Sequence, residues 1–185
     1  RDFAASYDLK STSVRFKSPD KLRVEGSVGM LRVTMIINGD TKGFRVPIRG
    51  WVKQSIKDTP QERQTEFDLG IVTESLWKDY DVIEEAADEE EGAQTYRLTY
   101  CWPNKHSKKQ VCWVERSTLK MLKRETYRAD GTMIGRFVYS EHKKLDGIWV
   151  PGCVHVYSGD GKLAVKTVQE NVRVNTVLAD SEFKF

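Results

Sequence analysis

The alternation of apolar and polar residues is the feature that most limits how this chain can fold. It is clearest in residues 31–37 and 96–102, where every second side chain is apolar. Because successive side chains of a strand point to opposite faces, this period of two predicts strands with one buried face. Turn sequences such as Asn38-Gly39 and Asp130-Gly131 separate the strands. They favour hairpins, so the strands should pair in an antiparallel meander.

The alternation predicts a mainly β chain with one non-β insert. Strands are expected near residues 2–9, 13–17, 21–26, 29–37, 43–49, 80–86, 94–102, 111–116, 119–127, 133–141, 148–157 and 162–174. Residues 59–79 lack alternation; Thr59 can cap a helix that starts at Pro60. The run Glu84 to Glu91 is acidic and is expected to form a solvated loop tip.

Length and charge narrow the class of protein. The chain has 185 residues and a formal net charge of +3, from 30 basic and 27 acidic residues. This length fits one domain, and the near balance of charge argues against a dedicated nucleic-acid binder. No apolar run approaches the ~20 residues of a membrane-spanning helix. We also find no leader peptide, so the chain is expected to be cytoplasmic, or exported and trimmed.

We searched the sequence for catalytic and metal-binding patterns and found none. His106, His142 and His155 fall in separate elements, and no nucleophile elbow, phosphate loop or zinc pair occurs. We therefore predict a protein that is not an enzyme and has no metal or cofactor. Cys101 and Cys112 flank a polar stretch, so they could form a disulfide across a hairpin. The alternative is buried free thiols.

Several predicted strands are apolar on both faces, for example at Tyr100-Cys101-Trp102 and Ile148-Trp149-Val150. A sheet of this kind must cover both faces, and the chain offers one helical insert to help. One solution is a sheet that bends around an apolar ligand cavity closed by the insert. The other is a packed β-sandwich or barrel without a ligand. The pattern of residues leaves both solutions open.

The order of elements and several short motifs resemble the LolA-like family of outer-membrane lipoprotein carriers. The similarity extends over nearly the whole chain. The motifs are Arg15-Phe16-Lys17-Ser18-Pro19-Asp20-Lys21, Ile36-Ile37-Asn38-Gly39-Asp40-Thr41, Tyr80-Asp81-Val82 after the insert, Lys123-Arg124-Glu125-Thr126-Tyr127, Gly147-Ile148-Trp149-Val150-Pro151 and the ending Asp180-Ser181-Glu182-Phe183.

The resemblance implies a single domain over residues 1–185. Its fold would be a curved antiparallel meander forming a half-open β-barrel of about eleven strands, with a helical lid at residues 59–79. It also implies a periplasmic carrier of lipid or lipoprotein acyl chains without cofactor. Two features depart from the family. The chain begins in an expected strand, so the N-terminal helix of the family is missing or was trimmed. Ser18 stands where the best-known carriers have an arginine that helps hold the lid shut.

The expected ligand site follows from this interpretation. Lid residues are expected at Phe67, Ile71, Leu76 and Trp77. The apolar cavity is expected to be lined by Leu22, Val24, Leu31, Val33, Met35, Phe44, Val46, Leu98, Tyr100, Phe137 and Tyr139. A shift of one residue in register would reverse this set. Expected partners are acyl chains and possibly membrane lipoprotein-sorting proteins, but no nucleic acid. The alternative function is a non-catalytic protein-interaction or sensor module of the envelope with the same fold.

Overall fold

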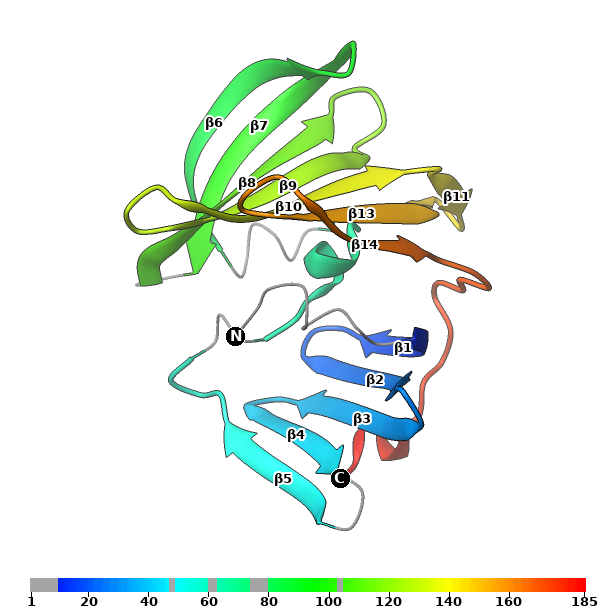
Figure 1. Cartoon of the computed structure of the whole chain (residues 1–185). Helices are drawn as coiled ribbons and strands as arrows, with labels where there is room; N and C mark the ends of the chain where they lie inside the picture. Colours follow the sequence, from blue (N-terminus) through cyan, green and yellow to red (C-terminus); the bar gives the residue numbers. More distant parts are fainter. Residues whose placement is uncertain (1–9, 47–48, 60–62, 74–79, 103–104) are drawn as a thin grey trace. The chain divides into compact units, whose positions relative to one another are not determined.

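The computed structural model describes residues 10–46, 49–59, 63–73, 80–102 and 105–185. These residues form fourteen strands and two 3-10 turns, and every strand pair is antiparallel. Two larger sheets, with five and seven strands, account for most of them (Figure 1). The chain divides into two compact units, one built on β1–β5 with residues 176–185 and the other on β6–β14. The expectation of a single domain stays a prediction.

The five-stranded sheet is a simple meander in the order β1-β2-β3-β4-β5. Tight turns place each strand beside its predecessor. In the β3–β4 turn, Gly39 adopts φ +58°, a conformation that glycine adopts without steric cost, and Asn38 then pairs with Thr41. The strands are β1 (Lys10–Lys17), β2 (Lys21–Val28), β3 (Leu31–Asn38), β4 (Thr41–Val46) and β5 (Gly50–Ser55).

The seven-stranded sheet has the order β14-β13-β10-β9-β8-β7-β6. Its meander is interrupted once, where the hairpin of β11 (Lys143–Leu145) and β12 (Ile148–Val150) leaves the sheet between β10 and β13. The other strands are β6 (Asp81–Glu90), β7 (Ala93–Trp102), β8 (Lys105–Glu115), β9 (Met121–Arg128), β10 (Met133–Ser140), β13 (Cys153–Ser158) and β14 (Leu163–Val168).

The mainly β, antiparallel and unclosed character predicted from the sequence is confirmed. Among the strands described, β1 and β5 are the edges of one sheet and β6 and β14 the edges of the other, so neither closes on itself. The count differs, with fourteen described strands instead of about eleven. One reason is that two short strands, β12 and β13, stand where one strand over residues 148–157 was expected, and that the short strand β11 was not expected. The strand expected at residues 2–9 lies outside the described residues.

The acidic run at residues 84–91 is not a loop, which corrects the sequence prediction. It belongs to β6, which pairs along its length with β7 and turns at Glu91-Gly92. Cross-strand partners compensate the charges: Trp113 Nε1 donates to Asp88 Oδ2 at 3.0 Å, and Lys123 pairs with Glu90. Pairing with an apolar neighbouring strand thus outweighs the low strand propensity of the acidic residues.

The predicted helical lid is reduced in the described residues to one 3-10 turn, η3 (Glu66–Leu69). The side chain of Asp68 accepts a hydrogen bond from the backbone N–H of Thr65 at 2.9 Å, which satisfies one orphan donor at the start of the turn. Gly70 follows with φ +80°, a left-handed conformation that ends the turn. A helix over residues 59–79 is therefore not present in the described part of this segment.

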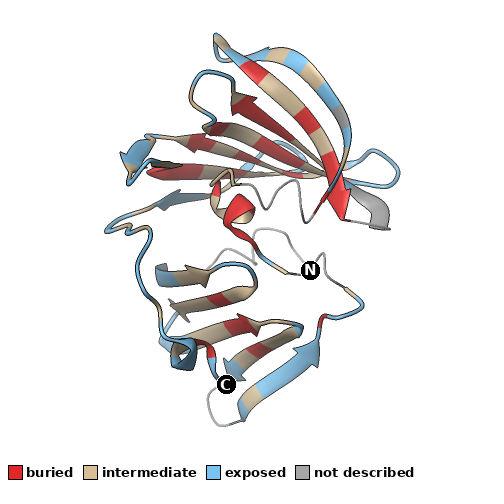
Figure 2. Ribbon diagram, turned by 180° about the vertical axis from the view of Figure 1, so that it is seen from behind, coloured by how far each residue is buried: buried red, intermediate tan, exposed pale blue. Residues whose placement is uncertain are grey.

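Burial differs between the two sheets. Most of the buried apolar residues lie in the seven-stranded sheet, whereas β5 is almost entirely exposed (Figure 2). A second 3-10 turn, η4 (Asp180–Phe183), packs on β2 and β3. In the described part of the chain, no helix is long and apolar enough to span a membrane.

Candidate functional site

The register of the five-stranded sheet gathers the predicted ligand-binding residues of that sheet on one face. Across β2 and β3, Leu22 lies opposite Ile37 and Val24 opposite Met35. Met35 in turn lies opposite Phe44 of β4. We call this side the apolar face of the five-stranded sheet; it comprises Val14, Phe16, Leu22, Val24, Val28, Leu31, Val33, Met35, Ile37, Phe44 and Val52. The side chain of Val46 lies outside the described residues.

Burial along this face changes from one end of the strands to the other. At one end Leu22, Ile37 and Ile56 form a buried cluster, against which Phe16, Val24 and Met35 pack. At the other end of the strands Val28 and Leu31 show about half of their surface to solvent, as do Val14 and Val52 on the edge strands β1 and β5. The face is therefore a closed core at one end and an open apolar surface at the other.

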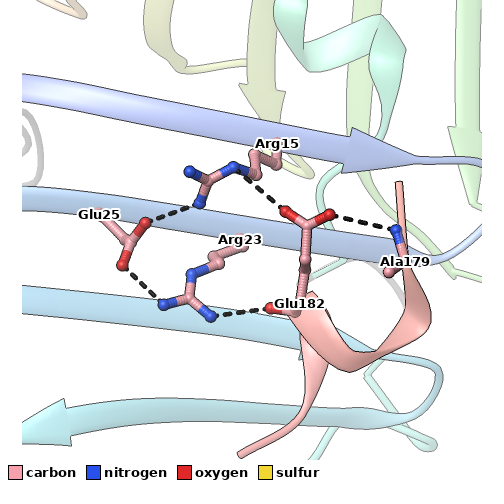
Figure 3. Close-up of polar contacts among 5 residues, drawn as sticks. All are labelled: Arg15, Arg23, Glu25, Ala179 and Glu182. Atoms are coloured by element: carbon pink, nitrogen blue, oxygen red, sulfur yellow. Dashed lines mark hydrogen bonds and ion pairs between the residues drawn. The ribbon is translucent and has the colours of Figure 1, made fainter. Parts of the chain in front are cut away.

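The opposite face of the same sheet is charged and is covered by the C-terminal residues of the chain (Figure 3). Arg15 and Arg23 both donate to Glu25, at 2.8 and 2.7 Å. Arg23 also donates to the carbonyl O of Glu182 at 2.8 Å, and Arg15 lies 3.4 Å from its carboxylate. These arginines lower the pKa of Glu25. The C-terminal segment thus covers the charged face of the sheet and leaves the apolar face uncovered by these residues.

Aromatic contacts also hold the C-terminal residues, up to Phe185, on this face of the five-stranded sheet. Phe183 is fully buried, and its carbonyl O accepts a hydrogen bond from Asn38 Nδ2 at 3.3 Å. The ring of Phe185 meets Trp51 edge-on at 5.4 Å. A Cβ on Gly43 would stand 2.5 Å from that ring, so glycine makes room for it. We call residues 176–185 the C-terminal tail.

The seven-stranded sheet has an apolar face as well. One row across it joins Leu98, Cys112, Arg124, Phe137 and Val156 of neighbouring strands. The predicted residues Leu98, Tyr100, Phe137 and Tyr139 all lie on this face, and all four are buried. The sequence thus grouped them correctly by face, although this part of the expected site is packed rather than open.

Arg124 is the residue of this face that sequence analysis missed. Its side chain is 5% exposed. Nε donates to Tyr139 Oη at 3.2 Å and Nη1 to Gln110 Oε1 at 2.9 Å, and the guanidinium lies 4.4 Å from the centre of the Phe137 ring. Tyr100 Oη donates to the same Gln110 oxygen at 3.2 Å. A buried charge is costly without such bonds. Arg124 therefore contacts Tyr139 directly and is linked to Tyr100 through Gln110.

No signal in the sequence marks Arg124. It stands in the run Lys123-Arg124-Glu125, where every residue is charged and the apolar alternation of a strand is absent. Lys123 and Glu125 point to the opposite face, where Lys123 lies 3.9 Å from the centre of the Trp113 ring and Glu125 accepts from Arg136 Nε at 2.7 Å. Arg124 and Glu125 are both 5% exposed, and only the pairing with β8 and β10 shows that Arg124 is the one on the apolar face.

Gly70 within the insert and Tyr80 directly after it contact the apolar face of the seven-stranded sheet. A Cβ on Gly70 would stand 2.6 Å from the ring of Tyr139 and 3.0 Å from Pro151. The ring of Tyr80 meets Tyr100 edge-on at 5.1 Å. Of the predicted lid residues, Phe67 is buried and Ile71 is half-buried, whereas Leu76 and Trp77 lie outside the described residues.

The possible disulfide between Cys101 and Cys112 is not formed, which corrects that expectation. Cys112 pairs with Leu98, three residues from Cys101 along β7. At about 3.3 Å per residue this offset amounts to roughly 10 Å, beyond the Cα separation of about 4.4–6.8 Å that a disulfide allows. All three cysteines are free and buried. Burial raises the pKa of Cys112 to about 12.

The histidines whose side chains are described have structural surroundings. His142 Nε2 lies 2.9 Å from the carbonyl O of Met121, which can only accept, and burial lowers the pKa of His142. His155 Nδ1 lies 3.9 Å from Cys153 Sγ, but Cys153 is fully buried and a substrate could not reach its thiol. The side chain of His106 lies outside the described residues. Among the residues that the structure describes, no three acidic, cysteine or histidine side chains are grouped so that they could hold a metal ion.

Comparison with known proteins identifies structures with a similar fold but no protein with a similar sequence. No protein-family model matches the sequence, and no curated protein is similar to it in sequence. Among solved structures, the fold is similar to that of a DUF1329 family protein from Desulfovibrio piger. The two share 17% identity with a TM-score of 0.58, and the match covers 94% of this chain and 86% of the other.

Two further solved structures are similar at 12% identity and a TM-score of 0.54. One is a domain assigned to an outer membrane lipoprotein-sorting protein of Vibrio parahaemolyticus, with 89% of this chain and 78% of the other covered. The second is a LolA superfamily protein from Nitrosomonas europaea, with 94% and 86% covered. At this level of identity the similarity establishes the LolA-like fold, and the resemblance expected from the sequence motifs is confirmed to that extent.

Proposed function

We propose that this chain, which has a LolA-like fold, is a periplasmic carrier that binds the acyl chains of lipids or lipoproteins on its apolar sheet faces. One observation supports this most directly. The apolar face of the five-stranded sheet holds a continuous set of aliphatic and aromatic side chains, and at one end they are exposed. Contiguous exposed apolar surface of this kind marks a binding site. The similarity to a lipoprotein-sorting domain supports acyl chains as the ligand.

Burial of an acyl chain provides enough free energy for micromolar binding. Each methylene removed from water contributes about 0.8 kcal/mol. Micromolar affinity corresponds to about 8 kcal/mol, so covering about ten methylenes reaches it before the costs of ordering the chain. The chemistry needs no catalytic group, metal or cofactor, because the acyl chain is bound and released without reaction.

The test is to purify the protein without detergent, record its native mass and analyse a solvent extract. We expect a bound mass that disappears on extraction and fragments as a lipid. Val33→Asp places a charge on the apolar face of the five-stranded sheet, where Val33 is half-buried, and should abolish this bound mass. Val168→Asp is the matched control, because Val168 is an exposed strand valine that pairs with Cys153, outside the apolar face of its sheet.

Circular dichroism of both variants distinguishes lost binding from lost folding. Phe137→Asp is not suitable for this purpose, since Phe137 is buried beneath Arg124 and the change would unfold the sheet. A protein that carries no lipid after incubation with fatty acids, phospholipids and a lipopeptide would contradict the proposal. A single stoichiometric protein partner in envelope extracts would then support an interaction or sensor module.

A further inference from the structure

The turn between β2 and β3 presents three apolar side chains to solvent. Val28 and Leu31 pair as the last residues of the hairpin and are 46% and 57% exposed, and Met30 between them is 102% exposed. We call Val28, Met30 and Leu31 the hairpin tip. Exposed methionine and leucine at the end of a rigid hairpin add nothing to the core. Their exposure costs solvation free energy that only an apolar environment would recover.

Basic residues surround the hairpin tip. Because β3 begins where β4 ends, the β4–β5 turn lies at the same end of the sheet as the tip. Arg32, Arg45 and Arg49 stand at this end and are exposed. In the described part of the chain, no ion pair joins any of these three arginines to an acidic residue.

The sequence around the hairpin tip is predominantly basic. Residues 26–57 contain six lysines and arginines and a single acidic residue, Asp40. Asp40 stands in the β3–β4 turn at the far end of the sheet, where it pairs with Arg63 at 2.7 Å. An apolar tip within an uncompensated basic surface is complementary to an anionic lipid bilayer, whose interface accepts apolar side chains while its phosphates attract arginine.

We infer that the hairpin tip docks this protein on anionic membrane surfaces, with Met30 and Leu31 entering the interface and Arg32, Arg45 and Arg49 contacting lipid phosphates. The inference does not rest on acyl-chain carriage. Val28 and Leu31 also end the apolar face of the five-stranded sheet, but Met30 and the three arginines do not belong to that face, so docking would hold for a protein that carries no lipid. Docking of this kind is reversible, because two or three side chains and three charges fall short of stable anchoring.

The experiment is co-sedimentation of the whole chain with vesicles of phosphatidylcholine, with or without phosphatidylglycerol. We expect binding to the anionic vesicles that weakens with added salt. Met30→Asp should lower the partition coefficient about tenfold or more, the value of one buried apolar side chain. Arg32→Gln and Arg49→Gln should each lower it about fivefold. Both kinds of residue are exposed, so the variants should fold as the wild type does.

Leu163→Asp is the matched control, since Leu163 is 55% exposed at the start of β14 in the other sheet. It should bind vesicles as the wild type does. Unchanged binding by Met30→Asp, an equal loss in Leu163→Asp, or equal binding to vesicles with and without phosphatidylglycerol would each overturn the inference. Absence of vesicle binding together with a dimer that Met30→Asp dissociates would also overturn it and would assign the tip to contacts between copies of the chain.

Discussion

At the scale of single residues, Gly70 shows how local backbone conformation positions the insert. Its φ of +80° is rarely adopted by other residues, and the ring of Tyr139 occupies the place of a side chain. Tyr139 is itself held by Arg124. A glycine at this position therefore lets the backbone of the insert approach the apolar face of the seven-stranded sheet directly.

We predict that Gly70→Ala destabilises the protein more than its backbone conformation alone explains. Gly147→Ala is the matched control, because Gly147 has φ +85° and nothing within 4 Å of a Cβ. The control should lose about 1–2 kcal/mol of unfolding free energy from left-handed strain. Gly70→Ala should lose about 1–3 kcal/mol more from overpacking against the ring. Urea denaturation measures both, and equal losses would show that Tyr139 does not contact the insert.

At the scale of elements, the C-terminal tail completes the five-stranded sheet without adding a strand. Its contacts reach residues about 160 positions earlier in the chain, such as Lys17 Nζ, which donates to the carbonyl O of Leu178 at 2.9 Å. Lys17 and Lys21 both donate to Asp180, and they lower its pKa to about 2. The tail is held by charges at its start and by the buried ring of Phe183 further on.

The lowered pKa gives the tail a defined pH dependence. A carboxylate whose pKa is depressed in the folded state stabilises that state above its ordinary pKa of 3.8. This contribution is lost as the pH falls from about 4 towards 2. We predict that the amide protection of residues 176–185, measured by hydrogen exchange, decreases over this range in the wild type and less steeply in Asp180→Asn.

Asp160→Asn is the control for that measurement. Asp160 also has a lowered pKa, but its partners Lys162 and Ser158 belong to its own β13–β14 turn. Its replacement should leave the protection of the tail unchanged at every pH. A wild-type tail whose protection is independent of pH down to 2 would contradict the role assigned to Lys17 and Lys21.

At the scale of the whole molecule, two sheets each present an apolar face, and they differ in how fully that face is buried. In the seven-stranded sheet it is buried, as Leu98, Tyr100 and Tyr139 show. In the five-stranded sheet Val28, Leu31 and Val52 remain exposed. If the chain carries acyl chains as proposed, this exposed apolar surface is buried in the complex. Ligand binding should therefore be visible in the stability of the molecule.

We predict that a saturating long-chain fatty acid raises the melting temperature of the delipidated protein. At a concentration of about 100 times Kd, binding adds about 2.7 kcal/mol to the free energy of unfolding. For a chain of this length that corresponds to about 5–10 °C. Scanning calorimetry measures the shift. Val33→Asp should show none, Val168→Asp should show the full shift, and an equal shift in both would place the ligand elsewhere.

The sequence by itself determined the elements of this fold that depend on local patterns. Alternation and turn residues located most of the strands, including β3 and β7, because side-chain direction along a strand follows from the backbone alone. The same period grouped the predicted ligand-binding residues by face: Leu22, Val24 and Met35 share one side of their sheet, as Leu98 and Phe137 do of theirs. The similarity of the fold to LolA-like proteins could also be expected from the order of the motifs.

Only the tertiary structure decided which neighbours each strand receives, and several corrections follow from this. The acidic residues of β6 are in a strand because β7 and Trp113 provide partners for them. Cys101 and Cys112 form no disulfide because the β7–β8 register places Leu98, not Cys101, opposite Cys112. Arg124 is buried because Tyr139 and Gln110 satisfy its guanidinium. These outcomes depend on contacts between residues distant in the chain, and a local sequence pattern holds no information about such contacts.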